Sequence, residues 1–447
     1  MSRHVAILTI IFAAAICLFA TTAQAQTAAA GIQINASGEL KMNTVLDVNL
    51  KLKAKEAQKA LGSDLCTASE MRCISLKQLE KAIEANNGAL TEEMKYLAGL
   101  TRIEYVFFIP ETKDIIIAGP AEGWFAEPGI DRVIGVKSRR PVVRLEDLAS
   151  ALRMYGPNGS DPQKVGCSID PTPEGLVRLQ AFIKTVNPQR MNYSAIRSGM
   201  VSALGNHTVR IDGVNPNTHF AKVLVEADYR MKLIGIGLEK APAGLRSFIS
   251  AANPEDVARN AMCRWYFVPN YQCVRMSPDG SAIQLVGQGV KLVGEDEVVS
   301  AAGNRQSTAG SQNTASKQFT QSFTSRYEKI AQVNPVYGEL RNLIDLSIIA
   351  AYMNQEDIFG KAEWSMPILG DETKYSIETV SAPQFAPAAC ALHYKNGRLM
   401  TPIGGGVEIQ PQIALNEDNL ISNDDKEVAQ TGSALTAPEG KWWWNNK

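Results

Sequence analysis

Ile103-Glu-Tyr-Val-Phe-Phe-Ile109 and Asp114-Ile-Ile-Ile-Ala118 are two runs of β-branched and aromatic residues, separated by Pro110-Glu-Thr-Lys113. Such runs on either side of a short polar turn predict a β-hairpin. Gly119-Pro120 follows the second run and is expected to end that strand. This hairpin is the clearest local signal in the chain, and the other segments are interpreted around it.

Amphipathic helices are expected on both sides of the hairpin. Lys51–Leu61 and Leu76–Asn86 precede it, and Leu145–Tyr155 follows it with its leucines on one stripe. Another helix is expected to begin at Pro173, with Thr172 as its N-cap. Strands and helices are therefore mixed irregularly. This pattern predicts an α+β fold of β-hairpins and short mixed strands with amphipathic helices, arranged in two lobes.

The segment His219–Gly237 fits both a strand and a helix, because its apolar residues recur at both periods. We favour the helix. In a helix, Glu226 and Arg230 form one i,i+4 pair, and Asp228 and Lys232 form another, both in the stabilising orientation.

Composition suggests where the chain divides. Ala, Gly, Ser, Thr, Asn and Gln dominate residues 299–317, which is typical of a linker or a mobile loop. We expect six segments in order: a signal peptide (1–25), an N-terminal strand and helical region (26–100), an α+β core (101–294), a low-complexity linker (295–318), a helical then β-rich C-terminal region (319–415) and a mobile tail (416–447) that ends in three tryptophans.

The first 25 residues have the three parts of a secretory signal peptide. Arg3 precedes the apolar run Val5–Ala20, and Ala23 and Ala25 supply the small residues of a cleavage site. The apolar run is shorter than the ~20 residues that span a bilayer comfortably. We therefore expect cleavage after Ala25 and a periplasmic, cell-envelope or extracellular protein.

The chain is nearly neutral, with 45 basic and 46 acidic side chains. This balance argues against a nucleic-acid partner, which requires a basic surface to neutralise phosphates. No segment after the signal peptide is long and apolar enough to predict a membrane span. The expected partner is an unidentified envelope component or a second copy of the chain.

Six cysteines follow the signal peptide, and an even number in an exported protein suggests disulfides. Proximity in the sequence favours two local pairs and leaves one long-range pair: Cys66–Cys73, Cys263–Cys273 and Cys167–Cys390. The alternative is that some of these residues are small, buried and apolar, with free thiols.

Common catalytic motifs are missing. The sequence has no Gly-x-Ser-x-Gly elbow, phosphate loop, His-Glu-x-x-His or paired Cys-x-x-Cys, and it implies no cofactor. The carboxylates that could perform acid–base chemistry are Asp170, Glu174 and Asp228. Asp170 and Glu174 are one helical turn apart, yet both positions also suit ordinary capping residues, which is the reading we favour.

Three histidines follow the signal peptide, His207, His219 and His393, and no two have the spacing of a metal site. No metal is therefore expected. The candidate binding residues are His219, Arg230 and Trp124. Trp124 follows a Gly/Pro-rich loop and could stack against a ligand such as a sugar, although we favour a position that plugs the edge of the core.

Asp345 lies among apolar residues of a helix that is expected to start at Asn334 and to run to about Met353. A buried carboxylate needs a partner. Arg341, four residues earlier, is the partner expected from the sequence.

Several motifs occur in an order that resembles a known family. They are Gly119-Pro-Ala-Glu-Gly-Trp124, Arg140-Pro-Val142 before Leu145-Glu-Asp-Leu148, Val165-Gly-Cys-Ser-Ile-Asp-Pro-Thr-Pro-Glu-Gly-Leu176, Val225-Glu-Ala-Asp-Tyr-Arg-Met-Lys232, Tyr337-Gly-Glu-Leu-Arg-Asn342 and Gly405-Gly-Val-Glu-Ile-Gln-Pro411. Together they resemble a planctomycete-type family of exported proteins that is catalogued only as a domain of unknown function. The resemblance covers most of residues 100–411. It implies an exported bacterial protein and supplies no reaction, cofactor or active site.

These observations support three hypotheses. The leading one is a non-enzymatic exported protein of the cell envelope with a binding or structural role. The second is a hydrolase that acts on envelope polymers or peptides through Asp170, Glu174 and Asp228. The third is a self-assembling periplasmic scaffold. Convergence of these carboxylates with Arg230 or His219 in one cleft would favour the enzyme.

Overall fold

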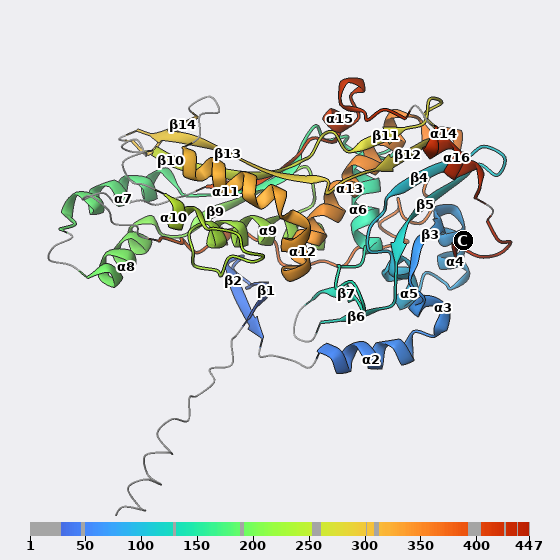
Figure 1. The fold of residues 1–447 in the computed structure, drawn as a ribbon, viewed down its shortest axis with the longest axis horizontal. Coiled ribbons are helices and arrows are strands. Elements are labelled where there is room, and N and C mark those ends of the chain that lie inside the picture. The colour runs from blue at the N-terminus through green and yellow to red at the C-terminus, as the bar shows by residue number, and fades with distance from the viewer. Residues whose placement is uncertain are drawn as a thin grey trace, which may run out of the picture.

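The computed structural model describes residues 28–446, except for 46–49, 128–130, 188–191, 253–260, 301, 308–312, 392–403, 424–425 and 436. The expected signal peptide and its cleavage site lie outside these residues, as does His393. Figure 1 shows an elongated molecule with a sheet at each end. Helices α6 (Leu145–Tyr155) and α13 (Val336–Gln355) lie between the two sheets.

A seven-stranded mixed sheet forms one end of the molecule. Its spatial order is β14 (Arg305–Ser307), β13 (Val290–Val299), β10 (Ala261–Pro269), β16 (Gly405–Ile409), β8 (Val165–Asp170), β9 (His207–Asp212) and β15 (Phe385–Ala386). β10 and β16 pair in parallel, and the other neighbours pair antiparallel.

A six-stranded antiparallel sheet forms the other end. Its order is β11 (Val274–Met276), β12 (Ala282–Leu285), β4 (Tyr105–Ile109), β5 (Asp114–Ala121), β3 (Ser69–Ser75) and β17 (Trp443–Asn445). The predicted hairpin is confirmed, because β4 and β5 pair directly, with Ile109 opposite Asp114. Two small antiparallel sheets complete the strands: β1 (Ala28–Ile34) with β2 (Leu40–Val45), and β6 (Trp124–Ala126) with β7 (Val133–Gly135).

The predicted α+β class is confirmed by helices packed on and between these mixed sheets. The helices besides α6 and α13 are α2 (Leu50–Ala60), α3 (Ser63–Cys66), α4 (Leu76–Ala85), α5 (Glu92–Lys95), α7 (Pro173–Thr185), α8 (Tyr193–Leu204), α9 (His219–Gly235), α10 (Phe248–Ala251), α11 (Thr314–Ser325), α12 (Tyr327–Val333), α14 (Ile358–Lys361), α15 (Pro411–Ala414) and α16 (Glu427–Ser433). Short 3-10 turns occur at Leu97–Gly99 and Glu417–Asn419. The predicted N-cap of α7 is also confirmed, since the Thr172 side chain accepts a hydrogen bond from the backbone N–H of Gly175.

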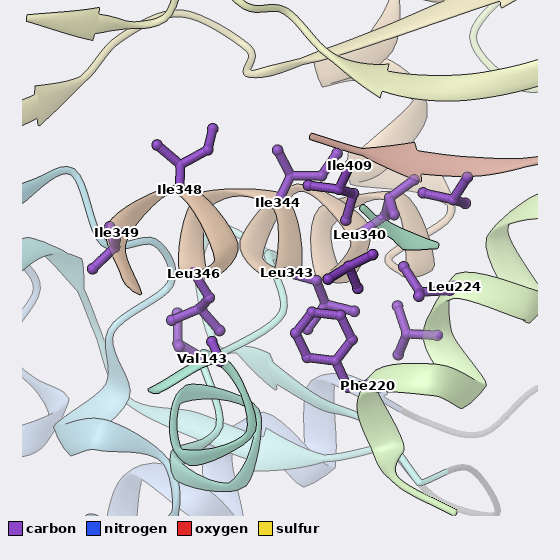
Figure 2. Packing of buried hydrophobic residues seen from close by; sticks show 14 of the residues in the cluster. Val143, Phe220, Leu224, Leu340, Leu343, Ile344, Leu346, Ile348, Ile349 and Ile409 are labelled. Atoms are coloured by element: carbon purple, nitrogen blue, oxygen red, sulfur yellow. The ribbon is translucent and has the colours of Figure 1, made fainter. Parts of the chain in front are cut away.

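Helix α13 forms the centre of the core. Residues 336–353 of this helix are all buried, so apolar side chains surround its axis instead of forming one stripe. Figure 2 shows Leu343 of α13 near Phe220 of α9, and Leu346 near Val143. Ile409 of β16 lies close to Ile344 on the opposite side of the helix. α13 therefore joins the helical layer to the seven-stranded sheet.

The expected partner of Asp345 is wrong. Asp345 is buried as predicted, but it pairs with Arg102 at 2.7 Å, and Arg341 pairs with Glu328 at 3.0 Å. An arginine that precedes a carboxylate by four residues has the less favourable helical orientation. Arg102, the observed partner, comes close to Asp345 only when the chain has folded, because the two residues are 243 positions apart in the sequence. The helix start also differs, because α13 begins at Val336, and Asn334 instead ends α12.

The two sheets do not divide at residues 295–318. Residues 295–299 are the end of β13, residues 305–307 form β14, and α11 begins at Thr314. Each sheet takes strands from both sides of this segment, and one cluster of buried apolar residues extends through both sheets. Low-complexity composition therefore does not mark a boundary between lobes here.

The C-terminal segment is not a mobile tail in its described part. β17 is an edge strand that pairs antiparallel with β3, with Trp444 opposite Cys73. The ring of Trp443 lies 4.8 Å from the guanidinium carbon of Arg72. Apolar and cation–π contacts thus hold the tryptophans against the six-stranded sheet.

The expected disulfides are absent from the described residues. All six thiols are free: Cys66, Cys73, Cys167, Cys263, Cys273 and Cys390. Cys66 donates to the carbonyl oxygen of Gln58, whereas Cys73 packs in the cluster that contains Trp444. Cys263 and Cys273 both lie in the main core, where Asn313 donates to Cys263. Cys167 and Cys390 belong to separate apolar clusters.

The helices in the described part of the chain include none with both the length and the apolar character that a membrane crossing requires.

We expect the chain from residue 26 onward, unfolded in guanidinium without reductant, to incorporate six equivalents of iodoacetamide, because the six thiols are free. In the folded protein Cys66 should react first, since the other five cysteines are buried. Mass spectrometry measures both results. C66S should remove the early label alone. Fewer than six labels on the unfolded chain would show that a disulfide forms.

Candidate functional site

Helix α9 carries most of the charged candidates. The prediction of a helix over a strand is confirmed, and the Thr218 side chain caps it by accepting from the N–H of Ala221. Both predicted pairs are present: Arg230 lies 3.4 Å from Glu226, and Lys232 lies 3.0 Å from Asp228. The helix is buried almost throughout, between the seven-stranded sheet and α13. Its charged side chains therefore form two separate groups.

The first group, the sheet-side cluster, consists of Asp170, His207, Asp228, Lys232 and Arg305. Asp228 is fully buried, and Nζ of Lys232 donates both to its Oδ2 and, at 2.7 Å, to the carbonyl oxygen of Ile169. Asp170, the last residue of β8, accepts from Arg305 of β14 at 2.6 Å. The sheet thus brings together two of the three carboxylates singled out in the sequence.

Burial controls the protonation of this cluster. It raises the pKa of Asp228 to about 6, even though Lys232 acts in the opposite direction. Burial also lowers the pKa of His207 to about 3, because the cationic form loses its hydration. At Asp170, burial is outweighed by the hydrogen bond from Arg305 and nearby positive charges, so its pKa is lowered.

Two polar atoms of the cluster are left unpaired among the described residues. They are Oδ1 of Asp228 and Nε2 of His207. The adjacent hollow, lined by His207, Lys232 and Gly404 among others, holds only about 20 Å³, which is room for about one water molecule. Among the described residues, this hollow therefore has no room for a sugar or a peptide.

Glycines let β16 approach this cluster closely. A Cβ atom at Gly405 would lie 2.7 Å from Oδ1 of Asp228 and 2.4 Å from the carbonyl oxygen of Trp265. A Cβ atom at Gly406 would lie 2.3 Å from the carbonyl oxygen of Cys167. The glycine run therefore closes the cluster by backbone packing.

Glu174 does not join the sheet-side cluster. It is exposed in the first turn of α7, where a carboxylate suits the positive end of the helix dipole. This confirms the capping interpretation for Glu174. The alternative interpretation, in which Asp170 and Glu174 form a carboxylate pair for acid–base chemistry, finds no support in this arrangement.

The second group is the helix-side network between α6, α9 and α13. Its members are Arg132, Asp147, His219, Glu226, Arg230, Glu239 and Glu339. Nδ1 of His219 lies 2.9 Å from Asp147, and Arg230 donates to Glu239 at 2.7 Å. Arg132 lies 3.2 Å from Glu226 and 2.9 Å from Glu339.

The network compensates its own charges. Burial raises the pKa of Glu226, but Arg132 and Arg230 outweigh it and hold that pKa below its usual value. Burial lowers the pKa of His219, yet the carboxylate of Asp147 more than offsets it, and the net shift is upward. Each charge therefore has a buried partner, as a stable interior requires.

The two groups lie on opposite sides of α9. Positions 226 and 228 are two residues apart, which is about 200° around a helix. Asp228 and Lys232 consequently face the sheet, whereas Glu226 and Arg230 face Arg132. The carboxylates do not converge with Arg230 or His219 in one cleft, which counts against the hydrolase hypothesis.

Trp124 is not a surface platform. It is only 4% exposed, packs with Val133 and Val142, and makes an edge contact with Tyr96 at a centroid distance of 6.2 Å. The Gly/Pro loop thus turns the ring inward. The favoured interpretation, a plug at the edge of the core, agrees with this burial.

An open hollow beside α6 was not identified from the sequence. This hollow, the α6 hollow, has a volume of about 260 Å³. Its lining comes from α6, Ser160, the loop before α9 and a later loop: Ser150, Arg153, Met154, Ser160, Gly213, Val214, Asn215, Thr218, Glu372, Ile377 and Thr379. Its lining residues come from segments that are far apart in the sequence and form no motif. No local sequence pattern could therefore have predicted this hollow.

A wider groove of about 760 Å³ lies between α8 and the end of α9. Ile249 and Ala391 are part of its lining, and each precedes a segment outside the described residues by a few positions. The α6 hollow, in contrast, is lined throughout by described residues. In the described part of the chain, no group of three or more His, Cys, Asp or Glu side chains is placed to hold a metal ion.

Comparison with known protein families gives a match for one part of the chain. Residues 167–248 match the family model described as "Protein of unknown function (DUF1598)". The matched segment contains Asp170, His207, Asp228 and Lys232, together with the loop that lines one side of the α6 hollow. No curated protein and no solved structure matches the chain. A domain of this uncharacterised family is therefore present at residues 167–248.

We expect D228N to gain stability relative to the unmodified protein as the pH rises. Asp228 has a folded pKa of about 6 against 3.8 for the free group, so the folded state retains its proton between these values and the unfolded state releases it. The unmodified protein should consequently lose about 1 kcal/mol relative to D228N between pH 5 and pH 7. Urea unfolding at both pH values measures this difference.

H207Q is the matched variant for which the change in stability with pH is expected to have the opposite sign. The folded pKa of His207 is about 3 and the free value is 6.5, so the unfolded state binds the extra proton. The stability supplied by His207 is lost as the pH falls, and the unmodified protein should gain about 2 kcal/mol relative to H207Q between pH 5 and pH 7. If the two variants show the same pH dependence, the cluster is open to solvent and this account of its burial fails.

Proposed function

We propose that this protein is an exported, non-catalytic binding protein of the cell envelope. The observation that carries the proposal is a contrast between its charged groups and its open hollow. The candidate carboxylates are either buried in ion pairs or isolated on the surface. The α6 hollow, by comparison, is accessible and is lined mainly by hydroxyl, amide and aliphatic side chains, together with the ion pair of Arg153 and Glu372.

Export rests on the sequence of the first 25 residues. The charged start, apolar middle and Ala23-x-Ala25 exit are the elements that signal peptidase requires. The resemblance to a planctomycete-type family of exported proteins supports the same destination.

Hydrolysis of envelope polymers or peptides is the competing proposal. A general acid must come within hydrogen-bond reach of the bond that it cleaves. The raised pKa of Asp228 suits such a role chemically, yet Asp228 is fully buried, and the hollow lined by its partner Lys232 admits about one water molecule. Self-assembly as a scaffold remains a further proposal, for which light scattering of the purified protein is the direct test.

Export is tested by expressing the full chain in a bacterium with a signal peptidase. We expect the envelope fraction to contain a chain whose first residue is Gln26, as determined by mass spectrometry. A25R should accumulate as the uncleaved precursor, because a large side chain at the exit position blocks the peptidase. Recovery of the unmodified chain from the cytoplasm with Met1 or Ser2 at its start would contradict export.

Binding without catalysis is tested with purified, insoluble cell-wall material. We expect the protein to sediment with the material and to release no soluble sugar or peptide above the level of a heat-denatured control. D228N should sediment equally well. Release of soluble fragments by the unmodified protein, together with loss of this release in D228N, would establish the hydrolase instead.

A further inference from the structure

We infer that the α6 hollow binds a neutral N-acylated sugar residue. This inference rests on the proposed binding function and names its ligand class. The volume of about 260 Å³ lies just below the usual range of small-molecule sites, about 300–1,000 Å³. The site therefore accommodates one ring with its substituents and not a folded segment of polymer.

The paired charges of the lining favour a neutral ligand. Arg153 and Glu372 are the charged residues among those that line the hollow, and they pair with each other. The guanidinium of Arg153 also donates to the carbonyl oxygens of Leu369 and Tyr375. Three of its five N–H groups are thus bonded to the protein, and an ammonium or carboxylate on the ligand would have to compete with the existing ion pair for a countercharge.

The rim of the hollow offers hydrogen bonds to a polyhydroxylated ring. The exposed hydroxyls of Ser160 and Thr379 form no hydrogen bond with the described part of the protein. Asn215 accepts from the backbone N–H of Asn217 through Oδ1, which leaves its amide N–H₂ directed to solvent or ligand. Sugar hydroxyls both donate and accept, as these groups require.

The floor of the hollow is apolar and needs an apolar group from the ligand. Met154 and Ile377 are buried and Val214 is half-buried, and the three side chains line the same hollow. A plain hexose would leave this floor without a partner. An acetamido group supplies a methyl for the floor and an amide that can bond to Asn215 or the hydroxyls.

Ligand-observed NMR with the purified protein tests this assignment. We expect N-acetylglucosamine to bind, glucose to bind at least about fivefold more weakly, and glucosamine not to bind. The loss for glucose comes from the missing burial of the acetyl methyl and from the missing hydrogen bonds of the amide. Equal affinity for glucose and N-acetylglucosamine would overturn the inference.

Variants locate the binding. V214W fills the hollow and should abolish N-acetylglucosamine binding, while S160A and T379A should each weaken it about 2- to 10-fold. S198A removes a hydroxyl from the separate α8 groove and should leave binding unchanged. The rim residues are exposed, so S160A and T379A give a result even if V214W misfolds. Unchanged binding in both rim variants would overturn the inference.

Competition separates this inference from the proposed function. N-acetylglucosamine that releases the protein from cell-wall material shows that the polymer binds through the same hollow. If the free sugar neither binds nor displaces the protein, while the protein still sediments with the cell-wall material, the sugar site is overturned and the proposed binding function stands. Loss of sedimentation itself refutes the proposed function.

Discussion

The guanidinium of Arg132 lies between Glu226 of α9 and Glu339 of α13, and the rest of the structure is arranged around this contact. All three residues are buried. Removing one arginine and two carboxylates from water is costly unless each charge is compensated. Glu226 also pairs with Arg230, so four charges lock α9 against α13 in one register.

Because α9 is fixed in this way, its opposite face must lie against the seven-stranded sheet. Asp228 and Lys232 occupy that face and close over β8 and β16, where glycines permit the approach. The charged side chains on both faces of α9 therefore form ion pairs or hydrogen bonds that connect this helix to neighbouring elements. The same packing leaves α6 beside α9, with Met154 at the floor of the accessible hollow.

Local features could be predicted from the sequence, because their partners are close along the chain. The β4–β5 hairpin, the Thr172 cap and the two i,i+4 pairs on α9 belong to this group. Long-range features could not be predicted. Arg102 meets Asp345 across 243 residues, and β17 pairs with β3 from the other end of the chain. The even number of cysteines predicted disulfides, and the polar composition of residues 295–318 predicted a linker between lobes. Both predictions failed for the same reason, because composition carries no information on which segments and side chains face one another. Among the candidate residues, Asp170 and Asp228 share one cluster, whereas the hollow is built from residues that carry no motif.

The central claim is that the buried charges of the helix-side network hold α9 against α13 and stabilise the fold. Urea unfolding of E226Q at pH 7 tests it most directly, with the exposed carboxylate variant E174Q as the control. We predict that E226Q loses about 3 kcal/mol or more of unfolding free energy, since it leaves buried guanidinium groups undercompensated, while E174Q changes it by less than about 0.5 kcal/mol. An E226Q protein that is as stable as E174Q would contradict the account.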